Sequence, residues 1–151
     1  MRILMIYPQD PDTFWSFKHV LRFVSKRSTF PPLGLLTIAA MLPSDWDIKL
    51  VDLNVEALRE SDLRQADYVM IGTMLVHKES VKQIIARCAR VQKPIIAGGP
   101  LFTTGHEQFL EIPHFVLGEA EDLIPQLVSE DRKSTRLNSS HGYQSRMPSS
   151  A

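Results

Sequence analysis

Two short apolar segments that stop at glycine constrain the fold of this chain more than any other feature. Ile95–Ala97 ends at Gly98 and Gly99, and Phe115–Leu117 ends at Gly118. Each is long enough for one buried strand and continues into a stretch compatible with a helix. In an open parallel sheet this junction lies at the carboxyl end of a strand, where glycine permits close approach to a ligand or a positive φ. The two turns therefore predict a ligand-binding α/β domain.

Strand-like and helix-like segments alternate along residues 1–130, which predicts a parallel sheet wound on both faces. The expected strands are Ile3–Tyr7, Asp47–Leu53, Tyr68–Ile71, Pro94–Ala97 and His114–Leu117. The expected helices are Leu33–Leu42, Lys78–Arg90, Glu107–Leu110 and Ala120–Ser129, and Ala57–Gln65 is expected to form a short polar helix or a turn. The pattern favours an α/β, doubly wound, five-stranded sheet of the flavodoxin-like (Rossmann-like) type, with strand order 2-1-3-4-5.

Composition and charge narrow the class of protein. The 151 residues are enough for one ordinary domain, and 44% of them are apolar. Since 17 basic and 17 acidic residues balance, we expect no nucleic-acid partner. No apolar run approaches the roughly 18 residues of a membrane span. The single cysteine, Cys88, forms no internal disulfide and fits a reducing compartment, so we expect a cytoplasmic protein.

Residues 131–151 differ from the rest of the chain, because they are polar and show no hydrophobic period. Two stretches, 131–141 and 145–151, resemble the two ends of a translated sequencing adapter in one reading frame. A natural disordered tail is the alternative. We expect residues 1–130 to form the domain, residues 131–151 to be a disordered, non-native tail, and the natural chain to continue past Glu130.

The segments after the first and third strands exclude two common classes of this fold. Tyr7–Pro11 contains no glycine, so the phosphate loop of a dinucleotide-binding domain is missing. Gly72, Thr73 and Met74 place no carboxylate where a response regulator carries its phosphoacceptor. A nucleotide-binding domain and a response-regulator domain are therefore both disfavoured.

Four segments together resemble the cobalamin-binding domain that precedes the catalytic barrel in cobalamin-dependent radical SAM enzymes. In chain order they are Ile3–Pro8, Pro31–Leu36, Gly98–Pro100 and Gly118–Glu121, the last standing where the family usually has Gly-Glu-Gly-Glu. Thr13–His19 further resembles the hopanoid-methylase-like branch of that family. The resemblance covers residues 1–130.

The resemblance implies a corrinoid cofactor whose nucleotide tail threads along the end of the sheet. The implied cofactor-binding residues are Thr73, Met74, Gly98, Gly99, Pro100, Gly118, Glu119 and Glu121. Gly98 and Gly99 would leave a path for the tail, and the Thr73 hydroxyl would bind the tail or its phosphate. A large β-branched residue at either glycine should then abolish corrinoid binding and cost the fold comparatively little.

Each of these residues also has a purely structural explanation, which the sequence leaves open. Gly98 and Gly99 suit an ordinary tight turn from strand to helix. The Thr73 hydroxyl resembles a helix N-cap. Glu119 and Glu121 would stabilise a helix start through their negative charge.

The chain departs from many corrinoid proteins in lacking Asp-x-His-x-x-Gly, the motif whose histidine binds cobalt. Gln9–Trp15 contains neither histidine nor glycine, and the surroundings of His19 are typical of an amphipathic helix. The remaining candidates His77, His106 and His114 have no partner at metal-ligand spacing, and Cys88 lies on the apolar side of a helix. We therefore expect no protein metal ligand and no catalytic residue in this chain.

These features predict a cobalamin-binding module truncated from a radical SAM enzyme, which the resemblance implies is a methyltransferase acting on an unactivated carbon. The full-length protein would add a C-terminal radical SAM domain holding an iron–sulfur cluster and S-adenosylmethionine. One cysteine cannot hold such a cluster, so the chain alone would be inactive. The alternative is a stand-alone flavodoxin-like binding or interaction module without catalysis, with the aromatic segment 14–30 as its partner surface.

Overall fold

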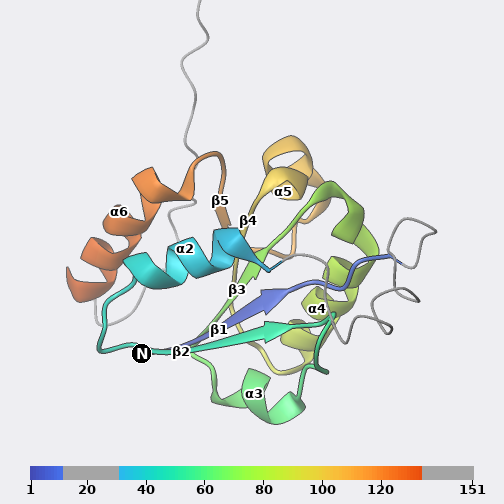
Figure 1. The fold of residues 1–151 in the computed structure, drawn as a ribbon, viewed down its shortest axis with the longest axis horizontal. Coiled ribbons are helices and arrows are strands. Elements are labelled where there is room, and N and C mark those ends of the chain that lie inside the picture. Colours follow the sequence, from blue (N-terminus) through green and yellow to red (C-terminus); the bar gives the residue numbers. More distant parts are fainter. Residues whose placement is uncertain (12–30, 134–151) are drawn as a thin grey trace, which may run out of the picture.

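The computed structural model describes residues 1–11 and 31–133. Its strands form one all-parallel sheet in the order β2-β1-β3-β4-β5 (Figure 1), which confirms the predicted fold and strand order. The strands are β1 (Arg2–Tyr7), β2 (Asp47–Asp52), β3 (Tyr68–Gly72), β4 (Ile95–Gly98) and β5 (His114–Val116). Each lies within one residue of its predicted bounds at both ends. Short apolar runs between turn residues mark the buried strands, whereas the partly exposed β2 is marked by alternating polar and apolar residues.

Helices follow the strands along the chain, and three of them differ from expectation. The helix expected over Ala57–Gln65 begins only at Glu60. The helices are α2 (Leu33–Met41), α3 (Glu60–Gln65), α4 (Lys78–Arg90), α5 (Pro100–Gly105) and α6 (Ala120–Lys133), with 3-10 turns η2 (Leu75–His77) and η3 (His106–Gln108). None of the helices in these described ranges is long and apolar enough to cross a membrane.

The predicted helix Glu107–Leu110 is wrong. The chain turns into α5 directly after β4, because Gly99 adopts a positive φ as the N-cap and Pro100 stands at the first helical position. Only the 3-10 turn η3 occupies part of the predicted range.

At the other end of the domain, α6 runs past the expected Ser129 to Lys133, so three residues assigned to the tail lie in a helix. The domain boundary at residue 130 stays a prediction.

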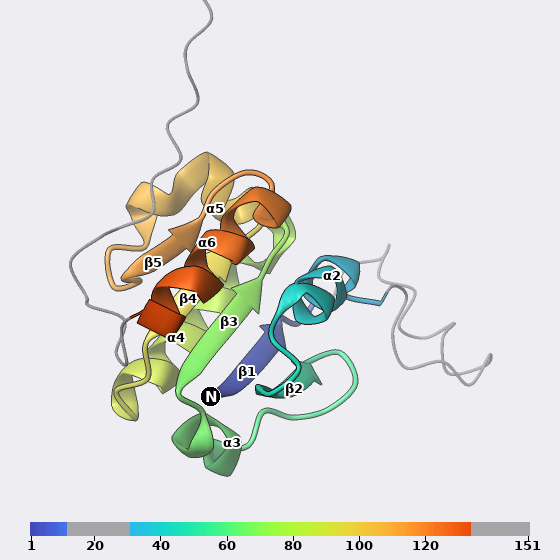
Figure 2. The same ribbon diagram turned by 90° about the vertical axis from the view of Figure 1, so that its left-hand side faces the viewer.

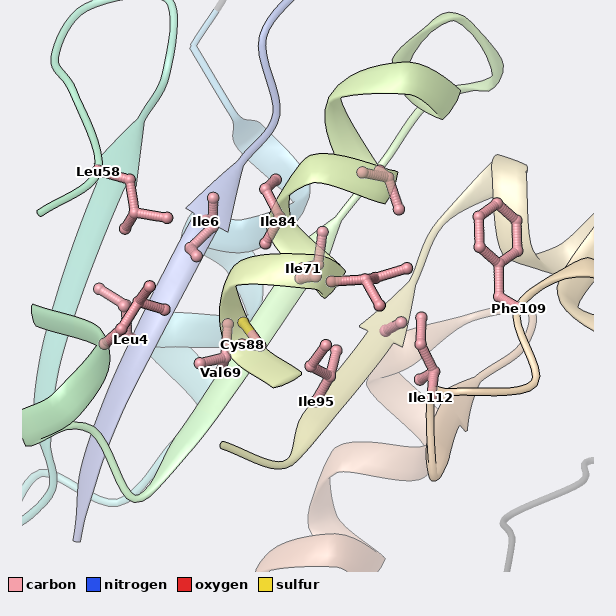
Figure 3. Close-up of a cluster of buried hydrophobic side chains, with 14 of the residues drawn as sticks. Leu4, Ile6, Leu58, Val69, Ile71, Ile84, Cys88, Ile95, Phe109 and Ile112 are labelled. Atoms are coloured by element: carbon pink, nitrogen blue, oxygen red, sulfur yellow. The ribbon is translucent and has the colours of Figure 1, made fainter. Parts of the chain in front are cut away.

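The two faces of the sheet bury separate apolar clusters, because alternate residues of a strand point to opposite faces. One cluster joins Leu4, Ile6, Val69 and Ile71 of the central strands to the inner side of α4 (Figure 3). Cys88 of α4 belongs to it and is fully buried, which confirms the predicted core thiol. Burial raises the pKa of this thiol to about 11, so it is protonated at neutral pH.

The opposite face carries the second cluster, which joins Ile3, Met5, Met70 and Ile96 to α2 and α6. Figures 1 and 2 show these two helices side by side over the same face of the sheet. Leu35 of α2 and Ile124 of α6 are buried in this layer. The layer ends near the carboxyl ends of the strands, and the candidate site begins there.

Candidate functional site

A cavity of about 430 Å³ lies at the carboxyl ends of the strands, on the face covered by α2 and α6. Its volume falls within the range of roughly 300–1,000 Å³ that is typical of small-molecule sites. The cavity is lined by all eight residues that the sequence suggested for the cofactor: Thr73, Met74, Gly98, Gly99, Pro100, Gly118, Glu119 and Glu121. The fold thus brings together, at the edge where open α/β sheets bind ligands, residues from three separate turns.

The inner wall of the cavity is apolar, and Tyr7, Thr73, Glu119 and Glu121 add polar groups to the lining. Met70, Ile96 and Val116, on the strands, form the apolar wall together with Leu35 of α2. Tyr7, at the end of β1, brings a phenol to the lining. Burial, with the nearby carboxylates Asp10 and Asp52, raises the pKa of Tyr7, so its hydroxyl remains a hydrogen-bond donor at neutral pH. The site can therefore hold a flat apolar group and bind polar groups at its mouth.

Thr73 ties the end of β3 to the end of β4. Its backbone N–H and its hydroxyl both donate hydrogen bonds to the Gly98 carbonyl oxygen, each at 3.1 Å. The residue precedes Met74, the N-cap of η2, so its hydroxyl does not cap a helix. The hydroxyl proton is thus used within the protein, and its oxygen lone pairs can still accept a hydrogen bond from a ligand.

Gly99 is required by the fold itself. Its φ is +102°, and a Cβ built on it would overlap the Thr73 carbonyl oxygen and lie 2.9 Å from the Thr73 nitrogen. The expectation that a large residue at Gly99 costs the fold little is therefore wrong, because the added atoms would strike neighbouring backbone. At Gly98 the nearest atom, the Val116 carbonyl oxygen, would lie 3.3 Å from a Cβ, which is a tight but much milder contact.

Gly118 has a different reason to be glycine. Its φ is +88°, yet a Cβ built there meets nothing within 4 Å. Conformation rather than space favours glycine at this turn. Glu121 stands in the first turn of α6, where its charge suits the helix N-terminus, and the exposed Glu119 precedes the helix. Both carboxylates also line the cavity, so the structural and ligand-binding explanations remain compatible.

His77 is a structural feature that sequence reasoning missed. The side chain is fully buried, with its Nδ1 accepting a hydrogen bond from the Met74 N–H at 3.0 Å. Its Nε2 lies 2.8 Å from Oδ1 of Asp10, and its ring packs edge-on against Tyr7. Asp10 and His77 are 67 residues apart, so no local spacing signals the pair.

The other histidines of the described segments lie away from the cavity. His106 packs against the ring of Phe115, and burial lowers the pKa of His114. Among the residues that line the cavity in residues 1–11 and 31–133 there is no histidine, and these ranges contain no group of three potential metal-ligating side chains. His19, the segment Thr13–His19 and the aromatic segment 14–30 lie outside the described residues.

Comparison with known proteins identifies the family of this chain. The family model of the B12 binding domain matches residues 21–128. An uncharacterized methyltransferase of Synechocystis sp. is 35% identical over 130 residues, which are 85% of this chain and 24% of that protein. The hopanoid C-2 methylase of Rhodopseudomonas palustris is 30% identical over 130 residues, which are 85% of this chain and 25% of the methylase. The chain thus spans about a quarter of the length of these relatives. These matches confirm the resemblance predicted from the sequence: the chain belongs to the B12-binding domain family.

Proposed function

We propose that this chain is the cobalamin-binding module of a larger methyltransferase. The observation that carries the proposal is the cavity at the carboxyl ends of the strands, whose lining includes every residue that the cobalamin-domain resemblance implied. The family match and the two methyltransferase relatives support the same ligand and reaction class. Cobalamin, when bound, supplies the methyl-transfer chemistry, and the chain itself binds and orients the cofactor.

The dimensions and chemistry of the cavity suit one part of the cofactor. A cavity of about 430 Å³ is too small to enclose a corrin macrocycle with its tail, but it suits the flat base and ribose of the nucleotide tail. The apolar wall formed by Met70, Ile96 and Val116 fits the face of that base. Thr73 and the Tyr7 hydroxyl offer polar contacts in the lining. The macrocycle would then lie across the mouth, over the ends of the strands.

In the proposed function this module is part of a larger enzyme. We infer a radical SAM enzyme that methylates an unactivated carbon, with the iron–sulfur cluster and S-adenosylmethionine held by a further C-terminal domain. Two observations support this inference: the chain spans about a quarter of the length of its relatives, and one of these relatives is a hopanoid C-2 methylase. Cys88, the single cysteine, is buried in the core and is not available as a cluster ligand.

Gly34 offers a direct test of whether the cavity holds the cofactor. It lines the cavity near the start of α2, and a Cβ added there meets nothing within 4 Å. Gly34→Leu should fill part of the cavity, whereas the matched control Gly34→Ala adds one methyl group. Both substitutions replace a helical glycine, so both should keep or raise stability, by up to about 1 kcal/mol for alanine.

Hydroxocobalamin titrated into the 151-residue chain, followed by visible absorbance, measures the affinity of each variant. We expect saturable binding to the wild type without the spectrum of histidine-ligated cobalt, nearly unchanged binding to Gly34→Ala, and at least tenfold weaker binding to Gly34→Leu. Equal affinity for all three would place the cofactor outside the cavity. No binding to the wild type would overturn the proposed function.

The alternative, a stand-alone binding or interaction module, depends on the aromatic segment 14–30, which lies outside the described residues. The source DNA beyond codon 130 separates the two. A CxxxCxxC motif downstream supports the truncated enzyme, and an authentic stop codon supports the stand-alone module.

A further inference from the structure

At the edge of the cavity, beyond the paired part of β1 and β3, the His77 side chain links the segments that follow the two strands. Their paired register ends at Ile6 and Ile71. Beyond this point the chain after β1 continues to Asp10, and the chain after β3 continues through Met74 to His77. The His77 imidazole touches both segments, through hydrogen bonds to Asp10 and to the Met74 backbone.

These two hydrogen bonds determine which nitrogen of the imidazole carries the proton. A backbone N–H can only donate, so Nδ1 of His77, 3.0 Å from the Met74 nitrogen, must be an unprotonated acceptor. Nε2 then carries the hydrogen and donates it to the Asp10 carboxylate, 2.8 Å away. The structure thus requires a neutral imidazole in the Nε2–H tautomer, because a proton on Nδ1 would face the Met74 N–H.

The imidazole stands directly behind two side chains of the cavity wall. Its ring centroid lies 5.0 Å from that of Tyr7, edge to face, and the Tyr7 hydroxyl lies 3.8 Å from the Met74 sulfur. Both Tyr7 and Met74 line the cavity, and Met74 is 52% exposed. A shift of the imidazole would therefore move two groups that face the ligand.

Further hydrogen bonds hold both sides of this arrangement. Thr73, directly before Met74, is bound to Gly98 of β4. On the β1 side, the Asp10 N–H donates to the side chain of Asn54, and Asn54 in turn donates to the Pro8 carbonyl oxygen. Met74 is therefore held between an anchor on β4 and the His77–Asp10 pair, with His77 as the buried link.

We propose that His77 is a positioning residue of the cobalamin site, acting through the backbone of Met74. This inference rests on the proposed function. It assigns to the buried imidazole a role in ligand affinity beyond its contribution to packing. Its Nδ1 acceptor, rather than its contact with Asp10, holds the Met74 side chain against the bound cofactor.

Two amide side chains separate the roles of the two imidazole nitrogens. In His77→Asn the amide oxygen reaches the position of Nδ1 and can accept the Met74 N–H, but it loses Asp10. In His77→Gln the longer amide reaches the position of Nε2 and can donate to Asp10, but it leaves the Met74 N–H without a partner. Asp10 is 41% exposed, so water can solvate its carboxylate when the imidazole is removed.

Hydroxocobalamin affinity and the thermal midpoint without cofactor are measured for each variant of the 151-residue chain. We expect His77→Asn to bind within about twofold of the wild type and His77→Gln to bind about three- to tenfold more weakly, the range of one lost hydrogen bond. In a Met74→Ala background the His77→Gln effect should disappear, since residues that act as a unit are not additive. If His77 served only the fold, both His77→Asn and His77→Gln would lower the thermal midpoint, and the two variants would bind hydroxocobalamin with equal affinity.

A second measurement avoids substituting the buried residue. Asp10→Ala removes the acceptor of Nε2–H from a partly exposed position, and Asp10→Asn, the matched control, keeps an acceptor oxygen. Nitrogen-15 NMR of the imidazole should show the Nε2–H tautomer in the wild type and in Asp10→Asn, and a mixture with weaker cofactor affinity in Asp10→Ala. An Nδ1–H or doubly protonated wild-type imidazole at neutral pH overturns the inference, as do equal affinities of His77→Asn and His77→Gln. If the wild type binds no cobalamin, the proposed function fails first and the positioning role fails with it.

Discussion

Leu35 of α2 packs directly onto the backbone of Gly72 at the end of β3. A Cβ built on Gly72 would lie 2.8 Å from Cγ of Leu35 and 2.9 Å from its Cδ2. Both residues line the cavity, so this close approach sets the distance between α2 and the sheet where the ligand is expected. Real Cβ atoms do not come this close to a side chain, which means that Leu35 must move if residue 72 gains one.

Gly72→Ala should therefore destabilise the chain by about 1–3 kcal/mol through overpacking. Leu35→Ala should cost about 2–5 kcal/mol, because it leaves a cavity in the second cluster. In the double variant the new methyl group occupies space vacated by Leu35. The double variant should therefore lose less free energy of unfolding than the two single variants lose together. Denaturant unfolding of the four proteins measures the coupling, and strict additivity would contradict the predicted contact.

Gly99 and Gly118 form a matched pair, since both have a positive φ but only one is crowded. Gly118→Ala should cost about 1–2 kcal/mol, the ordinary penalty of a left-handed conformation. Gly99→Ala should cost more than about 3 kcal/mol or prevent folding, because strain is combined with overlap against the Thr73 backbone. Thermal midpoints test whether Gly99→Ala is destabilised more than Gly118→Ala. Similar decreases in midpoint would show that the turn at Gly99 relaxes easily.

Thr73→Val should remove one of the two hydrogen bonds to the Gly98 carbonyl oxygen while keeping the shape of the side chain. We expect a loss of about 0.5–1.5 kcal/mol, because the backbone N–H still satisfies that oxygen. The control Thr73→Ser keeps the hydroxyl and should retain cofactor affinity. If Thr73→Val and Thr73→Ser bind hydroxocobalamin equally well, the hydroxyl has no role in the site.

The buried Cys88 thiol should make the stability of the fold depend on pH in the alkaline range. Its folded pKa is raised by burial from 9.0 to about 11, so above pH 9 the unfolded chain loses this proton before the folded one does. The contribution is fully present below pH 9 and is lost as the pH rises toward 11. The midpoint of the wild type should accordingly fall more steeply over this window than that of Cys88→Ala. If the midpoints of the wild type and of Cys88→Ala changed in parallel with pH, the thiol would ionise equally in the folded and unfolded states.

Two truncations test the end of the domain. Removing residues 134–151 should leave the midpoint unchanged, since this segment has few apolar residues to offset an ordering cost of roughly 1–2 kcal/mol per residue. Removing residues 131–151 also deletes the last three residues of α6. A small additional drop in midpoint would place the domain boundary after Lys133, and no difference would support the boundary at 130.

The strands, their order and the edge of the sheet at which the cavity lies could be predicted from local sequence patterns. Runs such as Tyr68–Ile71 and Ile95–Ala97, each stopped by glycine, carry the information locally, because a buried parallel strand needs a continuous apolar run and a turn residue. The cofactor candidates could be read in the same way, since each follows a strand end and the carboxyl ends of parallel strands meet at one edge.

The contacts of the individual residues at that edge could not be predicted from local sequence patterns. Gly99 looked like a path for a ligand and proved to be packed against Thr73, a neighbour 26 positions earlier in the chain. His77 showed no partner by spacing, yet it is buried between Tyr7, Asp10 and Met74. Such contacts join residues from different strands, and their distances depend on how the strand ends and helices pack rather than on any local pattern.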